Sequence, residues 1–263
     1  MSELYIPPEI VDYILDFLRD QPEALKQCCL VSKSFIPPTR THLFNHVDFE
    51  ESKHLKAWGE IFSEHADSPA IYTRSLAFHH TESIVEMDLK CVRSFSNVVR
   101  LDLRGHYQNQ LEPGDCFILF HGLLPAVKSL CLSWSNIPLR SVFNLICTFP
   151  HLEDLDVEGF EPANDNGVIS LSSPLPVLTG SLSLKTVTAN FASRLLELSS
   201  TFRLRKIIHR PGFMDEFEGV ESLVGKCSGT LECLDIRSRR TSVKSRLIDP
   251  RYKFSVLLNC YRQ

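Results

Sequence analysis

Apolar residues near the start of the chain recur at helical spacing. One stripe stands at positions i, i+4, i+7 and i+8: Ile10, Ile14, Phe17 and Leu18. Val11 and Leu15 widen this stripe beyond what one small core requires. Pro7 and Pro8 precede the stripe, and proline suits the first turn of a helix because its missing N–H would be unsatisfied there anyway.

The same reasoning predicts two more short helices before residue 49. A second helical stretch begins at Pro22 and has Leu25, Cys28 and Cys29 as its apolar positions. Two prolines at 37–38 are expected to interrupt the chain before Leu43. Three short helices would then hold more apolar surface than their own interior can bury. Such a unit should place the surplus against another protein or the next domain.

After residue 75 the pattern changes to short segments in which apolar and polar residues alternate. The segments are 75–78, 100–103, 129–132, 154–157, 181–184, 206–209 and 233–236. Counted from Leu76, their spacings are 25, 29, 25, 27, 25 and 27 residues. Alternation predicts half-buried strands. Three segments also have an apolar residue three positions earlier, at Val98, Val127 and Leu152.

Stretches compatible with helix lie between these strands. They are 116–124, 141–147, 191–198 and 220–227, and 52–62 is a further helix ahead of the first strand. The unit is therefore strand, loop and helix, repeated. One such unit cannot bury its own apolar face, so stacking must supply the core. The stretch 161–180 is rich in Pro, Ser, Asn and Gly and is expected to be a long loop.

Composition is that of an ordinary globular protein, with 43% apolar and 23% charged residues in 263. We find no apolar run near the roughly 20 residues that a membrane span needs. Glu3 and Glu9 stand where a secretory signal would be basic. Nine scattered cysteines lack the spacing of a zinc site, and we expect reduced, mostly buried thiols. We therefore expect a protein of the cytosol or nucleus.

Motifs of catalysis are absent from the sequence. Neither a glycine-rich nucleotide loop nor a nucleophile elbow nor a zinc-protease helix occurs. His79 and His80 would point to opposite faces of a strand, which disfavours a shared metal. His209 occupies a strand position where an inward leucine is expected. It is either a histidine of the core or sheet edge, or a residue that senses pH. We expect no enzyme activity, metal or cofactor. The run 237–246 is either a solvated basic loop, a phosphorylation site near Thr241 or a nuclear import patch.

The N-terminal helices resemble the F-box over roughly residues 4–49. That family has a Leu-Pro-x-Glu-[Ile/Leu] helix and a Val-[Ser/Cys]-[Lys/Arg]-x-[Trp/Phe] helix. Here the segments read Ile-Pro-Pro-Glu-Ile at 6–10 and Val-Ser-Lys-Ser-Phe at 31–35. The departures are Ile6 for Leu and Phe35 for the commoner Trp. The alternative is a plain helical cap on the domain that follows.

The remainder resembles a degenerate leucine-rich repeat, because its period lies in the range of 20–29 residues. The expected fold is an α/β solenoid of parallel strands alternating with helices, preceded by a small all-α module. The predicted boundaries are 1–49 for the F-box-like module, 50–74 for a helical linker and 75–263 for the repeat domain. A doubly wound α/β sheet is the structural rival, since it also alternates strands and helices.

The F-box resemblance implies a substrate-receptor subunit of a cullin–RING ubiquitin ligase. The module would dock on the adaptor subunit of that ligase, and the repeats would hold a protein target for ubiquitin-dependent degradation. A non-catalytic scaffold that degrades nothing is the main alternative, and an α/β enzyme with a helical cap is a third. The residues expected to contact the adaptor, in an apolar patch partly exposed in the isolated chain, are Ile6, Pro7, Ile10, Ile14, Leu25 and Val31.

The outward strand positions are the candidate target-binding face. They are Asp102, Arg104, Cys131, Ser133, Asp156, Glu158, Ser183, Lys185, Asp235 and Arg237. The net charge of −4 is uneven, with −4 in residues 1–50, −6 in the middle and +6 in residues 202–263. This gradient predicts a polar protein or peptide partner, with Asp156 and Glu158 against basic groups and Lys185 and Arg237 against acidic ones. An ordinary solvated sheet face is the alternative, and we expect no nucleic-acid or membrane partner.

Overall fold

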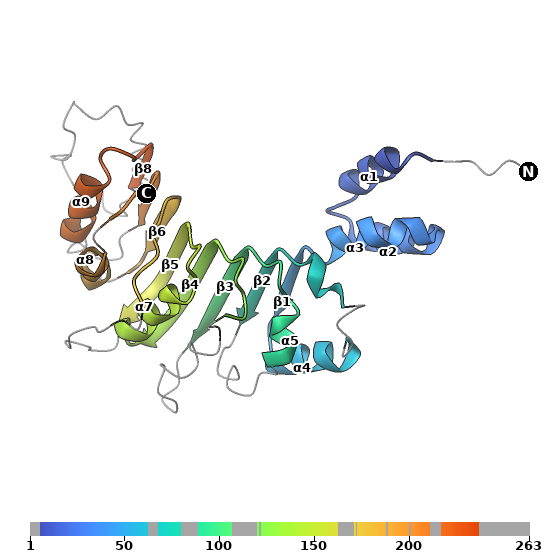
Figure 1. Ribbon diagram of the computed structural model, residues 1–263, viewed down its shortest axis with the longest axis horizontal. Coiled ribbons are helices and arrows are strands. Elements are labelled where there is room, and N and C mark those ends of the chain that lie inside the picture. The colour runs from blue at the N-terminus through green and yellow to red at the C-terminus, as the bar shows by residue number, and fades with distance from the viewer. Residues whose placement is uncertain are drawn as a thin grey trace, which may run out of the picture.

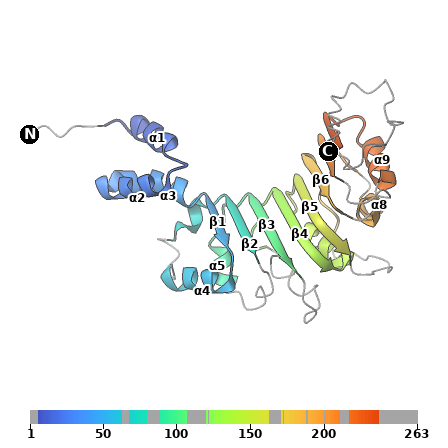
Figure 2. The same cartoon turned by 180° about the vertical axis from the view of Figure 1, so that it is seen from behind.

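The computed structural model describes residues 6–62, 68–79, 89–106, 120, 122–162, 171, 173–187, 189–199, 201–210 and 217–236. A small group of helices lies at the N-terminal end, and a curved row of parallel strands follows it (Figure 1). The helices project beyond the first strand, and this projection is also visible from behind (Figure 2). None of the described helices is long and apolar enough to cross a bilayer.

The helical module, residues 6–44, contains α1 (Pro8–Phe17), α2 (Pro22–Val31), the 3-10 helix η1 (Lys33–Phe35) and α3 (Ile36–Leu43). Pro8 and Pro22 stand at the starts of α1 and α2, as predicted. Pro37 and Pro38 do not break the chain. They lie in the first turn of α3, where a residue without an N–H loses no helical hydrogen bond.

Eight strands form one sheet, and neighbouring strands follow the order of the chain. They are β1 (His46–Phe49), β2 (Ser75–His79), β3 (Arg100–His106), β4 (Ser129–Ile137), β5 (Asp154–Pro162), β6 (Ser181–Lys185), β7 (Lys206–Arg210) and β8 (Cys233–Ile236). Every adjacent pair is parallel. This sequential order fits stacked repeats and lacks the reversal that marks a doubly wound sheet.

The buried side of the sheet is a pair of apolar ladders. In the first, Leu101, Leu130, Leu155 and Leu182 lie in register on neighbouring strands. In the second, Leu103 and Leu132 stand side by side. All six leucines are at most 2% exposed, which confirms the predicted core. The residues three positions before the strands, such as Val98, are buried as well.

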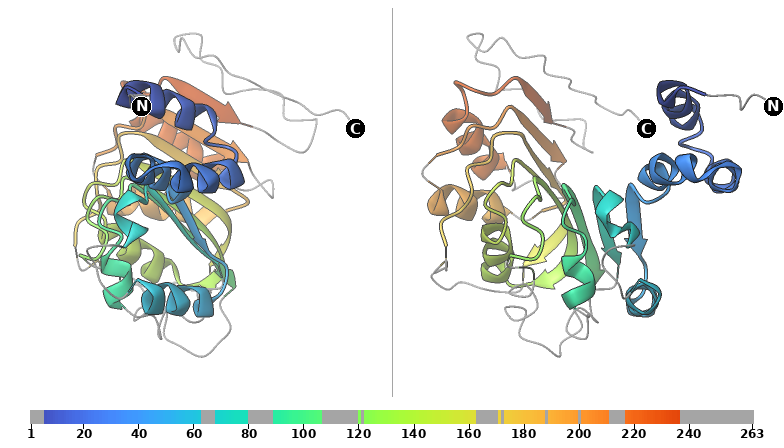
Figure 3. Two further views of the ribbon diagram at one scale, coloured as in Figure 1. Left: turned by 90° about the vertical axis from the view of Figure 1, so that its right-hand side faces the viewer. Right: turned by 45° about the vertical axis from the view of Figure 1, so that its right-hand side comes forward.

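Helices cover the ladders and complete one continuous core. They are η3 (Pro69–Tyr72), α4 (Ser52–Ile61), α5 (Leu89–Arg93), α7 (Leu139–Cys147), α8 (Ala189–Leu198) and α9 (Phe217–Lys226). In the right panel of Figure 3, α7, α8 and α9 lie to one side of the strands they accompany. Phe143 of α7 stacks on Phe191 of α8 with ring centroids 5.2 Å apart. Neighbouring units therefore share side-chain contacts across the stack.

The sheet begins earlier in the chain than the predicted boundary at residue 75. Residues 46–49 pair with β2, and α4 packs against the same core, so much of the predicted linker is part of the sheet domain. Aromatic side chains explain this placement: Phe49 stacks on Phe78 at 5.6 Å and meets Trp58 edge-on at 5.8 Å. We refer to residues 46–236 as the repeat domain.

Several other expected elements differ in detail. Most of the predicted helix at 116–124 lies outside the described residues, and Leu123 and Leu124 follow in a turn and a short irregular stretch. Strand β5 runs to Pro162, into the predicted loop, of which 163–170 and 172 lie outside the described residues. The described residues from 173 to 180 contain neither helix nor strand. The predicted helices at 141–147, 191–198 and 220–227 correspond to α7, α8 and α9.

Candidate functional site

The helical module has a very small core of its own. Val11, Leu15 and Leu25 are buried together, and Leu18, Cys28, Phe35 and Leu43 pack partly against them. On α1 the residues Val11, Leu15 and Leu18 fall on one arc of the helix, because successive residues turn by about 100°. This arc faces the interior of the module.

The adjoining arc of α1 is apolar and exposed. Tyr13 is 73% exposed and Phe17 is 77% exposed, and Ile10 and Ile14 are also exposed. At the end of α2, Leu30 and Val31 are similarly uncovered. We call these residues the apolar module surface: Ile6, Ile10, Tyr13, Ile14, Phe17, Leu30 and Val31.

Five of the six residues predicted to contact an adaptor are exposed, and one is not. Ile6, Ile10, Ile14 and Val31 belong to the apolar module surface, and Pro7 is exposed beside it. Leu25 has no exposed surface, so its expected exposure was wrong. Its side chain fills the space between α1 and α2 because the module has few other residues to form a core.

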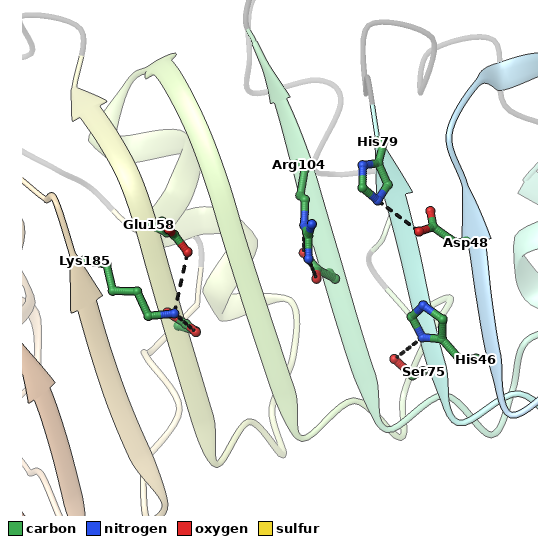
Figure 4. Close-up of polar contacts among 9 residues, drawn as sticks. His46, Asp48, Ser75, His79, Arg104, Glu158 and Lys185 are labelled. Carbon is green, nitrogen blue, oxygen red and sulfur yellow. Dashed lines mark hydrogen bonds and ion pairs between the residues drawn. The ribbon is translucent and has the colours of Figure 1, made fainter. Parts of the chain in front are cut away.

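The outward strand positions form rows across the sheet. One row contains Asp102, Cys131, Asp156 and Ser183, and the next contains Arg104, Ser133, Glu158 and Lys185. Figure 4 shows Arg104, Glu158 and Lys185 on this outward face. Asp235 lies on β8 at the level of Ile208 of β7, and Arg237 lies outside the described residues. Sequence alternation therefore placed the described members of the face correctly.

Most of the predicted charges on this face are already paired within the chain. Arg104 donates through Nε to Asp102 Oδ1 at 3.1 Å and through Nη2 to Asp102 Oδ2 at 2.7 Å. These hydrogen bonds, with the attraction of the Asp102 charge, raise the pKa of Arg104. Asp102 itself is buried, so the pair holds a carboxylate that would be costly without its partner.

A second ion pair joins β5 and β6. Lys185 Nζ lies 2.8 Å from Asp156 Oδ2 and 3.6 Å from Glu158 Oε2. Burial lowers the pKa of Lys185, but the hydrogen bond to Asp156 and the attraction of both carboxylates outweigh it, and the pKa is raised. We had assigned Lys185, Asp156 and Glu158 to contacts with a target, but in the free chain Lys185 is paired with Asp156 and lies near Glu158, and the three residues keep a net charge of −1.

Two contacts at the start of the sheet were not predicted. His79 on β2 lies 3.1 Å from Asp48 Oδ2 on β1 through Nε2, and His46 Nδ1 lies 3.0 Å from Ser75 Oγ. Figure 4 shows both pairs on the same face as Arg104. The signal was present in the alternation of residues 46–49, but it was missed because this segment was assigned to the end of the F-box-like module.

Cys131 is a thiol at the middle of this face. Cys131 lies between Asp102 and Asp156, and burial, followed by these two carboxylates, raises the pKa of its thiol to about 12. A thiol with so high a pKa stays protonated at neutral pH and is a poor nucleophile. Among the described residues, no three His, Cys, Asp or Glu side chains group as metal ligands would.

His209 is a core residue, buried in the second ladder beside Leu184. Burial lowers its pKa to about 4, against the opposing effect of a hydrogen bond with the backbone of Leu184. The ring is therefore neutral at physiological pH. This favours the prediction that His209 is a core residue over the alternative that it senses pH near 7.

Comparison of the chain with protein-family models, curated proteins and solved structures finds no significant match. The functional argument therefore depends on the two surfaces themselves. One is apolar and lies on a small module, and the other is polar, largely self-paired and lies on a broad sheet.

Proposed function

We propose that this chain is the substrate-receptor subunit of a cullin–RING ubiquitin ligase of the F-box type. The helical module would bind the adaptor subunit, and the outward face of the repeat domain would bind a protein target. The chain would make and break no bonds. Its contribution would be to raise the local concentration of target lysines near the ubiquitin-charged enzyme.

The observation that carries the proposal is the apolar module surface. Aromatic and branched residues such as Phe17 and Leu30 are more than 75% exposed on a unit that already has its own core. Large exposed apolar patches on small domains are typical of protein interfaces. Three of its residues, Ile6, Ile10 and Val31, lie in the segments at 6–10 and 31–35 that resemble the F-box.

The arrangement of the two parts supports the proposal further. The module projects beyond β1 at one end of the repeat domain, so an adaptor bound there would leave the outward sheet face open (Figures 1 and 2). A stable adaptor interface would bury about 1,600 Å² in total. A plain cap would instead be expected to turn its apolar side toward the sheet.

Copurification with the adaptor tests the proposal. The variant Ile10→Glu with Ile14→Glu places two charges in the apolar module surface, and we expect it to lose the adaptor. The matched control is Ile61→Glu with Val177→Glu, which charges two exposed apolar residues of the repeat domain, 70% and 45% exposed. The control should retain the adaptor in full yield.

The outcomes separate the candidate functions. Full adaptor yield from the module variant would refute the F-box assignment and leave the helical cap. Loss of adaptor from the module variant alone supports the assignment. Partners that accumulate on proteasome inhibition with the wild type, but not with the module variant, indicate a receptor for degradation, whereas unchanged partner levels indicate a scaffold.

A further inference from the structure

Strand β7 carries cations that form no ion pair with any residue that the structure describes. Lys206 and Arg210 are exposed and occupy outward positions at the two ends of the strand. Arg104 and Lys185 on the same face are held in ion pairs, but neither Lys206 nor Arg210 forms one with any described residue. Their charge is therefore available to a partner.

Two more cations stand directly before this strand. Arg203 and Arg205 are exposed, and neither forms an ion pair with a described residue. The main-chain carbonyl of Arg205 accepts hydrogen bonds from the N–H groups of Glu232 and Cys233, which fixes the start of β7 against β8. We call Arg203, Arg205, Lys206 and Arg210 the β7 basic strip.

Nearby carboxylates neutralise little of this strip. Asp156 is neutralised by Lys185, and Asp235 is buried and has an interaction of its own. Glu232 is exposed next to Arg205 and forms no ion pair with a described residue, so it offsets one of the four charges. A local positive charge therefore remains at this end of a face whose other described charges are mostly paired.

An unused hydrogen-bonding group lies in the same area. Ser183 on β6 is 5% exposed, and its hydroxyl makes no hydrogen bond with a described residue. It is in register with Ile208, which lies between Lys206 and Arg210 along β7. A buried hydroxyl without a partner is unfavourable. In its own row Ser183 lies between Asp156 on β5 and Ile208 on β7, beside the strand that carries the cations, so its hydroxyl is available to a polar group of a bound segment.

The spacing of the charges distinguishes among anions. Lys206 and Arg210 are four residues apart on a strand, which separates their Cα atoms by about 13 Å. A single phosphate group would need cations that converge on it. Charges spread over this distance suit carboxylates carried by an extended chain of about four or five residues.

We propose that the β7 basic strip binds an extended acidic segment of a protein target, rich in Asp or Glu. This inference rests on the proposed function for the existence of a target, and it identifies where and by what chemistry the target is held. The net charge of the chain is −4, and on the neighbouring strands Arg104 and Lys185 are held in ion pairs, so the face lacks the broad excess of cations that phosphate-backbone binding requires. A protein segment is therefore favoured over RNA or DNA.

Fluorescence anisotropy on the purified full chain tests the inference. The probe is a fluorescein-labelled peptide of alternating glutamate and serine, about ten residues long, at low salt. The test variant is Lys206→Glu with Arg210→Glu. The matched control, Lys56→Glu with Arg140→Glu, makes the same charge change at exposed positions of α4 and α7.

The wild type should bind the peptide, and added salt should weaken binding. The test variant should bind at least about tenfold more weakly, whereas the control should change by less than about twofold. Equal loss in both variants, or no binding by the wild type, would overturn the inference. Tighter binding of a uridine oligonucleotide of equal length than of the peptide would overturn it as well.

Adaptor copurification with the same two variants keeps the two proposals separate. The β7 variant should retain the adaptor, because its substitutions lie far from the helical module in the chain and in the stack (Figure 1). Peptide binding is measured on the isolated chain, so its outcome does not depend on whether an adaptor binds. Failure of copurification by the wild type would refute the receptor function and would not affect the peptide result.

Discussion

The helical module and the repeat domain distribute their apolar side chains in opposite ways. In the described module three apolar residues are buried, and seven large apolar residues form the exposed apolar module surface. In the repeat domain two ladders and the helices form one continuous buried core, and the outward face is largely polar. The module therefore leaves apolar surface exposed, whereas the repeat domain buries its own in the folded core.

This difference predicts where each region is sensitive to substitution. A small domain with few buried residues gains little free energy from its own core, and binding of a partner supplies the rest. Stacked repeats gain stability from each neighbouring interface.

Truncation in the ladder should have the largest effect. Leu130 has no exposed surface and lies between Leu101 and Leu155. Leu130→Ala should lower the free energy of unfolding of the repeat domain by about 2–5 kcal/mol, because the close-packed core cannot collapse around the void. Urea denaturation followed by tryptophan fluorescence of Trp58 measures the loss.

Leu15→Ala serves as the comparison from the other core. Leu15 is equally buried but belongs to the separate cluster of the module. Hydrogen exchange should show faster exchange in α1–α3 and unchanged protection of the strands. Loss of protection in both regions from this one substitution would show that the module and the repeat domain unfold as a unit.

His209 should make the stability of the repeat domain depend on pH. Its pKa in the folded protein is about 4, below the ordinary value of 6.5. As the pH falls from about 6.5 to 4, the unfolded chain binds a proton that the folded chain does not, so stability is lost on acidification. The loss should approach about 3 kcal/mol, since each unit of pKa difference is worth 1.36 kcal/mol.

The variant His209→Leu isolates this contribution. Leucine restores the residue expected at an inward ladder position, and it does not titrate. The pH dependence of the wild type should exceed that of the variant between pH 6.5 and 4, while other titrating groups cancel in the difference. Parallel pH profiles would show that His209 takes up its proton equally in both states.

Periodicity predicted the repeat domain better than it predicted the surfaces. The alternation at 100–103 and 129–132 is enough to place Leu101 and Leu130 on one buried face, because a strand has only two faces. A helix allows finer choices, and the stripe at Ile10 and Ile14 could not be distinguished from the inward arc at Val11 and Leu15. Only tertiary packing determines which arc faces inward.

The first strand was within reach of the sequence pattern, because residues 46–49 alternate and Val47 precedes Leu76 by 29 residues, a spacing that recurs between Leu101 and Leu130. Contacts of Phe49 with Phe78 and Trp58 place the segment in the sheet. The ion pairs were beyond the sequence pattern. The predicted face omitted Lys206 and Arg210, although the same alternation places both residues on the outward side of β7. That Lys185 is neutralised, whereas Lys206 and Arg210 are not, depends on which residues stand next to them on neighbouring strands.

The ion pair between Asp156 and Lys185 should contribute modestly to stability. Both side chains are less than a third exposed, and the atoms are 2.8 Å apart. A double-mutant cycle with Asp156→Ala and Lys185→Ala should give a coupling energy of about 0.5–1 kcal/mol that falls in high salt. A coupling energy of zero would mean that Asp156 and Lys185 do not stabilise each other, and both charges would then be available to bind a target.

The smallest effect on stability should come from the module surface. Phe17 is 77% exposed, so Phe17→Ser removes little buried area from the folded chain, and the free energy of unfolding should change by less than about 0.5 kcal/mol. The same substitution should weaken adaptor binding, since an aromatic side chain at an interface can dominate its free energy. Denaturation and copurification of one purified variant measure the two quantities. A marked loss of stability would mean that Phe17 supports the fold of α1, and the contrast between a module that exposes its apolar residues and a domain that buries them would no longer hold.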